Sequence, residues 1–162
     1  MKRIIVHWTA GAYTPNEHEL SCYHYLVGSK GEVYHGSHKP EDNENCNDRN
    51  YAAHTGGGNT GSIGIAVCGM FGFKDKQNVG DYPLTAIQCE RLFKLVAEVA
   101  KKYKINITPQ TVMTHYEFGI QHPNTDSKGK IDIIYLPPFP TVKQSEVGDY
   151  IRNKAKWYSS KI

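Results

Sequence analysis

The sequence predicts an α/β fold, in which one domain holds a central mixed β-sheet flanked by helices. Short apolar runs typical of strands alternate along the chain with segments of helical periodicity. The 162 residues match the usual length of one domain, and no linker or internal repeat divides them. Hydrophobic residues make up 39% of the chain, which suits a globular protein with a packed core. We therefore expect residues 1–162 to form a single domain.

The first half of the chain is expected to supply most of the strands. The pattern of residues 3–8 (RIIVHW) is that of a strand with its odd-numbered residues, His7 included, on one face. Residues 22–36 contain two strand-like halves around the turn signal Ser29-Lys30-Gly31, which indicates a hairpin. The largely apolar run 62–71 is typical of a central strand.

The second half is expected to contain the main helices and one further strand. A helix begins after the capping-box pair Thr85 and Gln88 and continues with an apolar stripe at helical spacing. Residues 111–118 (TVMTHYEF) have the composition of a strand, and residues 146–158 are expected to form a closing helix. This alternation of elements supports the α/β class.

Charge and composition exclude several classes of function. The net charge of +3 is mild and neither end carries a basic tail, so we expect no nucleic-acid partner. No apolar run approaches the roughly 20 residues of a membrane-spanning helix. The start, MKRIIVHWTAG, lacks the apolar segment of a secretory signal, so we expect a cytoplasmic protein made without a signal peptide.

The four cysteines do not form a metal-binding or redox motif. Their spacing contains no C-x-x-C pair, which excludes a zinc ribbon and a thioredoxin-like site. Cys68 and Cys89 lie in apolar contexts typical of buried thiols. Cys22 and Cys46 could form a disulfide in an oxidising compartment, and the sequence leaves that pairing open.

A glycine-rich stretch, HTGGGNTG at residues 54–61, precedes the strand-like run SIGIAV. Such loops often bring the backbone close to a phosphate. The P-loop pattern requires a lysine, however, and none occurs between Gly56 and Gly72. The dinucleotide pattern follows a strand and opens a helix, whereas this loop leads into a strand. We therefore expect no nucleotide here.

Two histidines occupy strand-like segments that are far apart in the sequence, His7 in RIIVHW and His115 in THYEF. If the two segments meet at one edge of the sheet, the pair suits Zn2+, which favours imidazole held on rigid elements. The alternative is that both are ordinary hydrogen-bonded histidines. Neither H-E-x-x-H nor G-x-S-x-G occurs, so a zincin protease and a serine hydrolase have no support.

Four motifs follow one another along the chain: IIVHWTAG (4–11), YHYLVGSKGEVY (23–34), AAHTGGGNTGSIGIAVCG (52–69) and THYEF (114–118). In this order they resemble the motifs of one family, the zinc-dependent N-acetylmuramoyl-L-alanine amidases. The likeness extends over most of the chain, and no single motif is decisive by itself. This family shares its fold with peptidoglycan recognition proteins and many phage endolysins.

The resemblance implies a site of defined composition. It consists of two histidine ligands, His7 and His115, and a third ligand, an Asp or Cys near the end of the domain. A lysine lies two residues before that third ligand. The motif GKIDI supplies both, as Asp132 and Lys130. The family's active-site tyrosine opens its Y-H-[FY] motif and is Tyr23 here. These residues imply a Zn2+ cofactor with three protein ligands, an arrangement typical of catalytic zinc.

Two departures from the family pattern affect this assignment. The loop between His115 and Asp132 is longer than in simpler members, and the proline that often follows the last ligand is absent. His122 and Asp126 therefore remain alternative third ligands. The stretch 13–21 is expected to be poor in helix, whereas many members carry a helix there.

The resemblance also implies a role for the glycine-rich stretch. In the family this turn lines the substrate groove, where glycines let a flat polar polymer lie close to the backbone. His54, Thr55 and Asn59 are therefore expected to bind substrate.

The implied function is zinc-dependent hydrolysis of the amide bond between N-acetylmuramic acid and L-alanine in peptidoglycan. Without a signal peptide, we expect a phage-type endolysin that acts on the cell wall after release from the cytoplasm. The alternatives are a cytosolic amidase that recycles soluble muropeptides and a non-catalytic peptidoglycan-binding module. Binding-only members tend to lose a metal ligand, and this chain has a candidate for each. The expected partner is peptidoglycan alone, and we expect a monomer.

Overall fold

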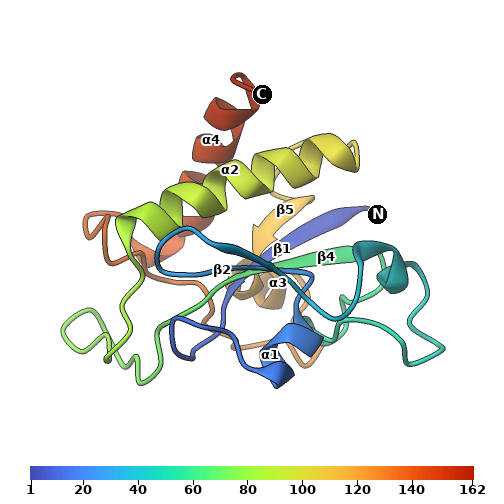
Figure 1. Ribbon diagram of the computed structural model, residues 1–162, viewed down its shortest axis with the longest axis horizontal. Helices are drawn as coiled ribbons and strands as arrows, with labels where there is room; N and C mark the ends of the chain where they lie inside the picture. The colour runs from blue at the N-terminus through green and yellow to red at the C-terminus, as the bar shows by residue number, and fades with distance from the viewer.

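A five-stranded mixed sheet runs through the middle of the computed structural model, which describes residues 1–162 (Figure 1). The strand order is β3-β2-β4-β1-β5. The four strands from β2 to β5 in that order are parallel to one another, and β3 is an antiparallel edge strand. The strands are β1 (Arg3–Trp8), β2 (Tyr25–Val27), β3 (Val33–His35), β4 (Ser62–Val67) and β5 (Val112–Thr114). The predicted α/β class with a mixed sheet is confirmed.

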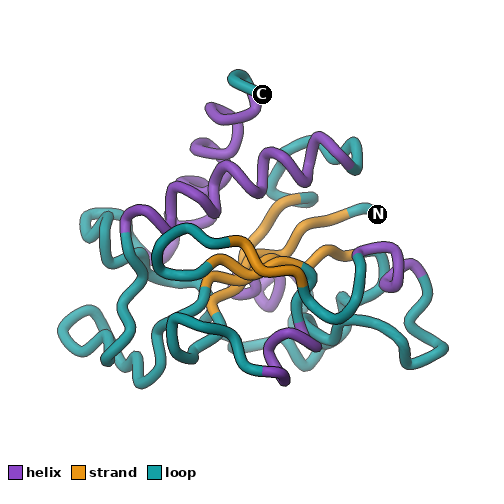
Figure 2. Tube along the Cα trace, in the orientation of Figure 1, coloured by secondary structure: helices purple, strands orange, loops and turns teal.

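Helices cover both faces of the sheet, as Figures 1 and 2 show. The long helices α2 and α4 lie together on one face, and the short helices α1 and α3 lie on the other. None of the helices is long and apolar enough to cross a membrane. The helices are α1 (Glu17–Cys22), α2 (Ala86–Lys102), α3 (His115–Gln121) and α4 (Val147–Ser159), with 3-10 turns η1 (Pro40–Glu44) and η2 (Gln144–Glu146).

Strand β1 divides its side chains between two layers. Its even-numbered residues belong to the main core, which includes the buried faces of α2 and α4. Ile5 packs on the opposite face against Phe118 of α3. His7 follows Ile5 on that face and is completely buried. The alternation predicted for residues 3–8 is therefore confirmed, and it sends His7 towards the short helices.

Several predicted elements are observed near their expected limits. Thr85 caps α2, and its hydroxyl oxygen accepts a hydrogen bond from the backbone N–H of Gln88. Strands β2 and β3 form the predicted hairpin, and β4 lies in the centre of the sheet. The closing helix is α4. Cys68 and Cys89 are buried, and all four cysteines are free thiols.

Two predictions of local structure were wrong, and both errors involve a capping box. The strand expected over 111–118 ends at Thr114, and α3 begins at His115. Thr114 and Glu117 form a reciprocal capping box that starts the helix. The stretch 13–21 was expected to be poor in helix, but it contains most of α1. Asn16 and Glu19 form a similar capping box at the start of that helix.

Candidate metal centre

Parallel pairing of two strands brings the predicted histidines together. β1 and β5 are neighbours in the sheet, and Val6 pairs with Thr114. Because parallel strands end at the same edge, the residues that follow this pair, His7 and His115, lie side by side. Their ring centroids are 4.7 Å apart. The sequence expectation that two distant segments meet at one edge of the sheet therefore agrees with the structure.

Asp132 lies between the two histidines. One carboxylate oxygen, Oδ2, is 2.7 Å from Nδ1 of His7. The other oxygen, Oδ1, is 3.1 Å from Nδ1 of His115. The three donor atoms all lie within 4.8 Å of one another. The side chains bring to one point two imidazole nitrogens and a carboxylate, which is the donor set of many catalytic zinc sites.

The far nitrogen of His115 has a hydrogen-bond partner that suits a proton on that nitrogen. Nε2 of His115 is 2.9 Å from Oγ of Ser127, which is itself 2.7 Å from the carbonyl oxygen of Gly56. A carbonyl oxygen only accepts, so the Ser127 hydroxyl donates to it. The hydroxyl oxygen then accepts from Nε2–H of His115. In that tautomer the lone pair of Nδ1 is available to a metal ion beside Asp132.

The far nitrogen of His7 contacts two side chains of the glycine-rich loop. Nε2 of His54 is 3.2 Å from the carbonyl oxygen of Ser62, so it donates, and Nδ1 of His54 is an acceptor. Nε2 of His7 is 3.2 Å from that Nδ1 and 3.4 Å from the hydroxyl oxygen of Thr55. Nε2 of His7 can therefore donate to either atom, and in that tautomer its Nδ1 is free to bind a metal ion beside Asp132.

The charges of these groups fit a metal cation. Burial lowers the pKa of His7 despite the nearby carboxylate, which favours a neutral ring. Burial alone would raise the pKa of Asp132, but hydrogen bonds with His115 and His7 hold it well below its usual range. A divalent cation that replaces the protons of these hydrogen bonds would be held by all three donors.

A cleft of about 390 Å³ opens over these donors. Tyr23 and Lys130 line it together with His115 and Asp132. The Tyr23 ring lies 5.1 Å from the ring of His7, measured between centroids. Burial, reinforced by the charge of Asp132, raises the pKa of Tyr23, so its hydroxyl remains a hydrogen-bond donor. The cleft therefore combines the donor set with a neutral phenol and a flexible cation.

The family to which the chain belongs is shown by its sequence. The model of the N-acetylmuramoyl-L-alanine amidase family matches residues 1–132, a span that ends at the third donor, Asp132. The chain belongs to the N-acetylmuramoyl-L-alanine amidase family. It is therefore an amide hydrolase that acts on peptidoglycan, and the expectation of an enzyme rather than a binding-only module is confirmed.

Solved structures of low sequence identity share the fold of this amidase. The N-acetylmuramoyl-L-alanine amidase LysC from Clostridium intestinale URNW aligns with a TM-score of 0.58 and 17% identity, over 96% of this chain and 85% of that one. The Ph2119 endolysin from Thermus scotoductus MAT2119 bacteriophage Ph2119 gives 0.52 and 19%, over 95% and 84%. Bumblebee PGRP-SA gives 0.50 and 16%, over 90% and 80%. A comparison with curated protein sequences found no match.

The alternative third ligands lie outside the donor set of this amidase. His122 stacks on Phe118, and its Nδ1 lies 3.2 Å from the carbonyl oxygen of that residue. Asp126 is exposed. Neither residue belongs to the group of converging donors, which contains Asp132. Of the two lysines beside the last donor, Lys130 lines the cleft and Lys128 does not.

The residues expected to bind substrate from the glycine-rich loop are mostly turned inward. His54 lines the cleft of the amidase but is only 6% exposed. Thr55 is 1% exposed, and the side-chain oxygen of Asn59 accepts from the backbone N–H groups of His54 and Thr55. Thr55 and Asn59 do not line the cleft. Their contact with substrate stays a prediction, whereas the contacts seen here stabilise the loop itself.

The glycines of this loop allow close packing within the protein. A Cβ at Gly58 would lie 2.4 Å from Cζ of Phe118, and a Cβ at Gly64, in the following strand β4, would lie 2.6 Å from Cγ of the loop residue His54. Gly57 has a φ of 81°, a conformation that favours glycine. The loop is therefore pressed against α3 and β4, where its histidine reaches His7.

Sequence reasoning missed two groups that contact the donor segment. Ser127 was not singled out, although it is completely buried and bonded to His115. Arg152 was placed within the closing helix without a role, although it is 4% exposed and bonded to Glu117. The Thr-x-x-Glu pattern at Thr114–Glu117 was the one local signal that pointed to this region.

Proposed function

We propose that this amidase holds a zinc ion on His7, His115 and Asp132 and uses it to hydrolyse the amide bond between N-acetylmuramic acid and L-alanine. The observation that carries the proposal is the convergence of Nδ1 of both histidines on one carboxylate. Both far nitrogens are engaged with neighbouring groups, which is typical of histidines that bind a metal. Three protein ligands leave room for water and substrate.

Two residues of the cleft, Lys130 and Tyr23, add a positive charge and a hydrogen-bond donor to the three metal-binding side chains. A zinc ion, when bound, activates water and polarises a carbonyl group as a Lewis acid. Lys130 lies at the cleft with an exposed side chain, and we assign it to the negative charge that develops on the scissile carbonyl oxygen. Tyr23 keeps its proton, and we assign its hydroxyl to a hydrogen bond with the same oxygen or with the attacking water.

An endolysin-like role in lysis of the cell wall is the biological context that we propose. The reaction needs a substrate that can enter a cleft open to solvent, and both intact peptidoglycan and soluble muropeptides meet that requirement. Recycling of soluble fragments therefore remains the second candidate. We also propose that the protein acts as a monomer, since every residue assigned to the site comes from one chain.

The bond that is cleaved can be tested directly. Digestion of purified peptidoglycan should release the amino group of L-alanine without forming new reducing sugar ends. A gain in reducing ends would identify a glycosidase and contradict the proposal. Parallel assays on intact sacculi and on soluble muropeptides separate a lytic role from a recycling role, because only a lytic enzyme should lower the turbidity of sacculi.

The metal can be tested in the same preparation. Elemental analysis should find one zinc per chain, and a chelator should abolish activity, which added zinc restores. Because the donors come from distant segments of the chain, removal of zinc should also lower the melting temperature. Full activity in protein that contains no metal would overturn the assignment.

A further inference from the structure

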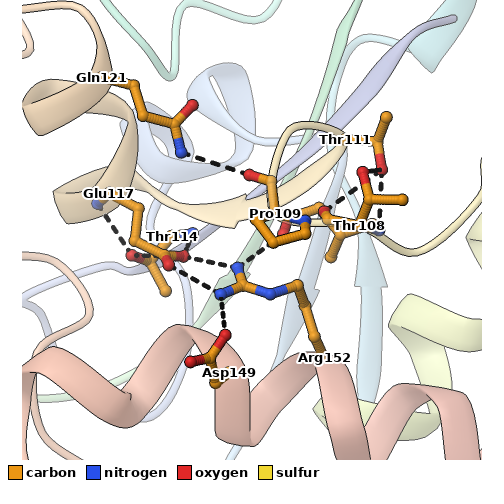
Figure 3. A network of polar contacts seen from close by, with 9 residues as sticks. Thr108, Pro109, Thr111, Thr114, Glu117, Gln121, Asp149 and Arg152 are labelled. Carbon is orange, nitrogen blue, oxygen red and sulfur yellow. Dashed lines mark hydrogen bonds and ion pairs between the residues drawn. The ribbon is translucent and has the colours of Figure 1, made fainter.

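The C-terminal helix α4 contacts the segment that carries the donor His115. α4 (Val147–Ser159) lies beyond residues 1–132, the part matched by the family model. Figure 3 shows Arg152 extending from α4 between Asp149 of its own helix and Glu117 of α3. The side chain of Arg152 is 5% exposed and that of Glu117 is 23% exposed, so this pair is largely shielded from water, whereas Asp149 is 71% exposed.

Arg152 uses both terminal nitrogens of its guanidinium group in this contact. Nη1 donates to Oε1 of Glu117 over 2.8 Å, and Nη2 donates to Oε2 over 2.9 Å. Nη1 also donates to the backbone carbonyl of Val112 in β5 over 3.0 Å. Nη2 donates to Asp149 over 2.7 Å. A bidentate guanidinium–carboxylate pair fixes orientation as well as distance.

Glu117 is also the residue that determines where α3 begins. Its Oε1 accepts a hydrogen bond from the backbone N–H of Thr114 over 3.0 Å. The Thr114 hydroxyl oxygen accepts in return from the backbone N–H of Glu117, also over 3.0 Å. His115 lies between these two residues as the first residue of the helix. The position of the Glu117 carboxylate therefore controls the backbone that carries His115.

The first turn of α3 is also hydrogen-bonded to Asp132, another of the proposed ligands. The backbone N–H of Tyr116 donates to the backbone carbonyl of Asp132 over 2.8 Å. Tyr116 follows His115 directly, so the first turn of α3 carries one donor and is hydrogen-bonded to the residue that supplies another. A displacement of this turn would separate two of the three donors from His7.

Gly148 provides the space that the contact requires. A Cβ at this position would lie 2.2 Å from both Cδ and Oε1 of Glu117. The Glu117 carboxylate could move away only with loss of its hydrogen bonds to Arg152 and Thr114. The close approach of α4 to α3 at Gly148 is thus part of the same arrangement.

We infer that Arg152 is a positioning residue for the proposed metal centre. Through Glu117 and the first turn of α3, Arg152 keeps His115 and Asp132 in register with His7. Arg152 neither lines the cleft nor belongs to the donor set, so it acts through other residues. The inference rests on the proposed zinc function. It makes α4 a part of the assembly of the active site.

The test measures zinc affinity in folded protein. Arg152→Met keeps the apolar length of the side chain and removes its bonds, so the Kd for zinc should rise about tenfold, the lower end of the usual cost of losing an outer partner. Arg152→Lys keeps the charge and should recover part of the affinity, and it also covers the case in which Arg152→Met does not fold. With saturating zinc, kcat should return towards the wild-type value and KM should not change.

Metal-free protein provides a second measurement. Hydrogen exchange at the amide of Tyr116 should become faster in both Arg152 variants, because the turn that hydrogen-bonds to Asp132 is released. Gly148→Ala should act in the same direction while leaving Arg152 intact, since the added methyl group displaces the Glu117 carboxylate.

Two controls on the same helix separate positioning from general loss of stability. Ile151→Ala removes a fully buried apolar side chain and destabilises α4 without touching α3 through polar bonds. Lys154→Ala removes an ion pair with Glu90, which belongs to α2. Both controls should keep the wild-type Kd for zinc, even where the melting temperature falls.

The outcomes distinguish this inference from the proposed function. Equal zinc affinity in wild type, Arg152→Met and Arg152→Lys would overturn the positioning role and leave the zinc site intact. A rise in Kd that is as large in Ile151→Ala as in Arg152→Met would also overturn it, because stability alone would then explain the effect. If the wild-type protein bound no zinc, both the inference and the proposed function would fail together.

Discussion

Nδ1 of His54 lies 3.2 Å from Nε2 of His7, on the side of the His7 ring away from Asp132. The glycine-rich loop therefore stands directly behind one donor. It also supports the other donor, since the carbonyl oxygen of Gly56 accepts from Ser127, whose oxygen contacts His115. One loop thus contacts the far nitrogen of His7 directly and that of His115 through Ser127.

Replacement of Asp132 should remove the metal. In Asp132→Ala, zinc and activity should be lost together, because two imidazoles alone hold the ion poorly and the carboxylate charge is gone. Zinc content after gel filtration measures the loss. Asp126→Ala, which changes an exposed aspartate of the same loop, is the control and should retain zinc. Retention of zinc in Asp132→Ala would mean that the third ligand is another residue.

Replacement of Lys130 should affect the rate and not the metal. Lys130→Ala should keep its zinc while kcat falls roughly 10²–10³-fold, the usual cost of removing one oxyanion donor. Lys128 lies two residues away outside the cleft, so Lys128→Ala should have a nearly wild-type kcat. Steady-state kinetics on a soluble muropeptide compare the two variants. Similar rates for both would leave Lys130 without a catalytic role.

Loss of the partner behind His115 should weaken zinc binding. Ser127→Ala removes the oxygen that accepts from Nε2–H, so both tautomers of His115 become accessible and the Kd for zinc should rise about 10–100-fold. Nitrogen-15 shifts of the ring in metal-free protein report the tautomer without relying on activity. Ser160→Ala, at an exposed serine far along the chain, is the matched control. A single unchanged tautomer in Ser127→Ala would contradict this role of Ser127.

Stability should fall in acid partly because His24 is buried as a neutral ring. Burial lowers the pKa of His24 to about 4, against an ordinary value of 6.5, although a hydrogen bond with Asn43 opposes the shift. Between these two values the unfolded chain binds a proton that the folded chain does not, so the free energy of unfolding decreases as the pH falls from 6.5 to 4. Over that whole range the contribution of His24 is roughly 3 kcal/mol.

Urea denaturation of wild type and His24→Gln at pH 7 and pH 5 measures this contribution. Glutamine can donate to Asn43 and accept from the backbone N–H of Gly64, as His24 does. The variant should therefore lose less stability than the wild type between the two pH values. An equal loss in both proteins would show that His24 does not carry the effect.

The α/β class and the order of most elements could be predicted from the sequence, which also named His7, His115 and Asp132 as candidate donors. Strand alternation placed His7 on the face away from the main core, and the pair Thr85–Gln88 marked the start of α2. These signals are readable because they depend on the side-chain period of a strand or on residues three positions apart. The same rule, applied to Thr114 and Glu117, would have corrected the strand predicted through His115.

The hydrogen-bond partners that support the donor residues are visible only in the folded structure. Ser127 and the carbonyl oxygen of Gly56 are 71 positions apart in the chain, and Arg152 is 35 positions from Glu117. Hydrogen bonds over such separations leave no periodic pattern in the sequence, since any buried serine or arginine could find its partner elsewhere. The pairing of β1 with β5 and the contact of α4 with Glu117 bring these distant segments together, and only then can the hydrogen bonds form.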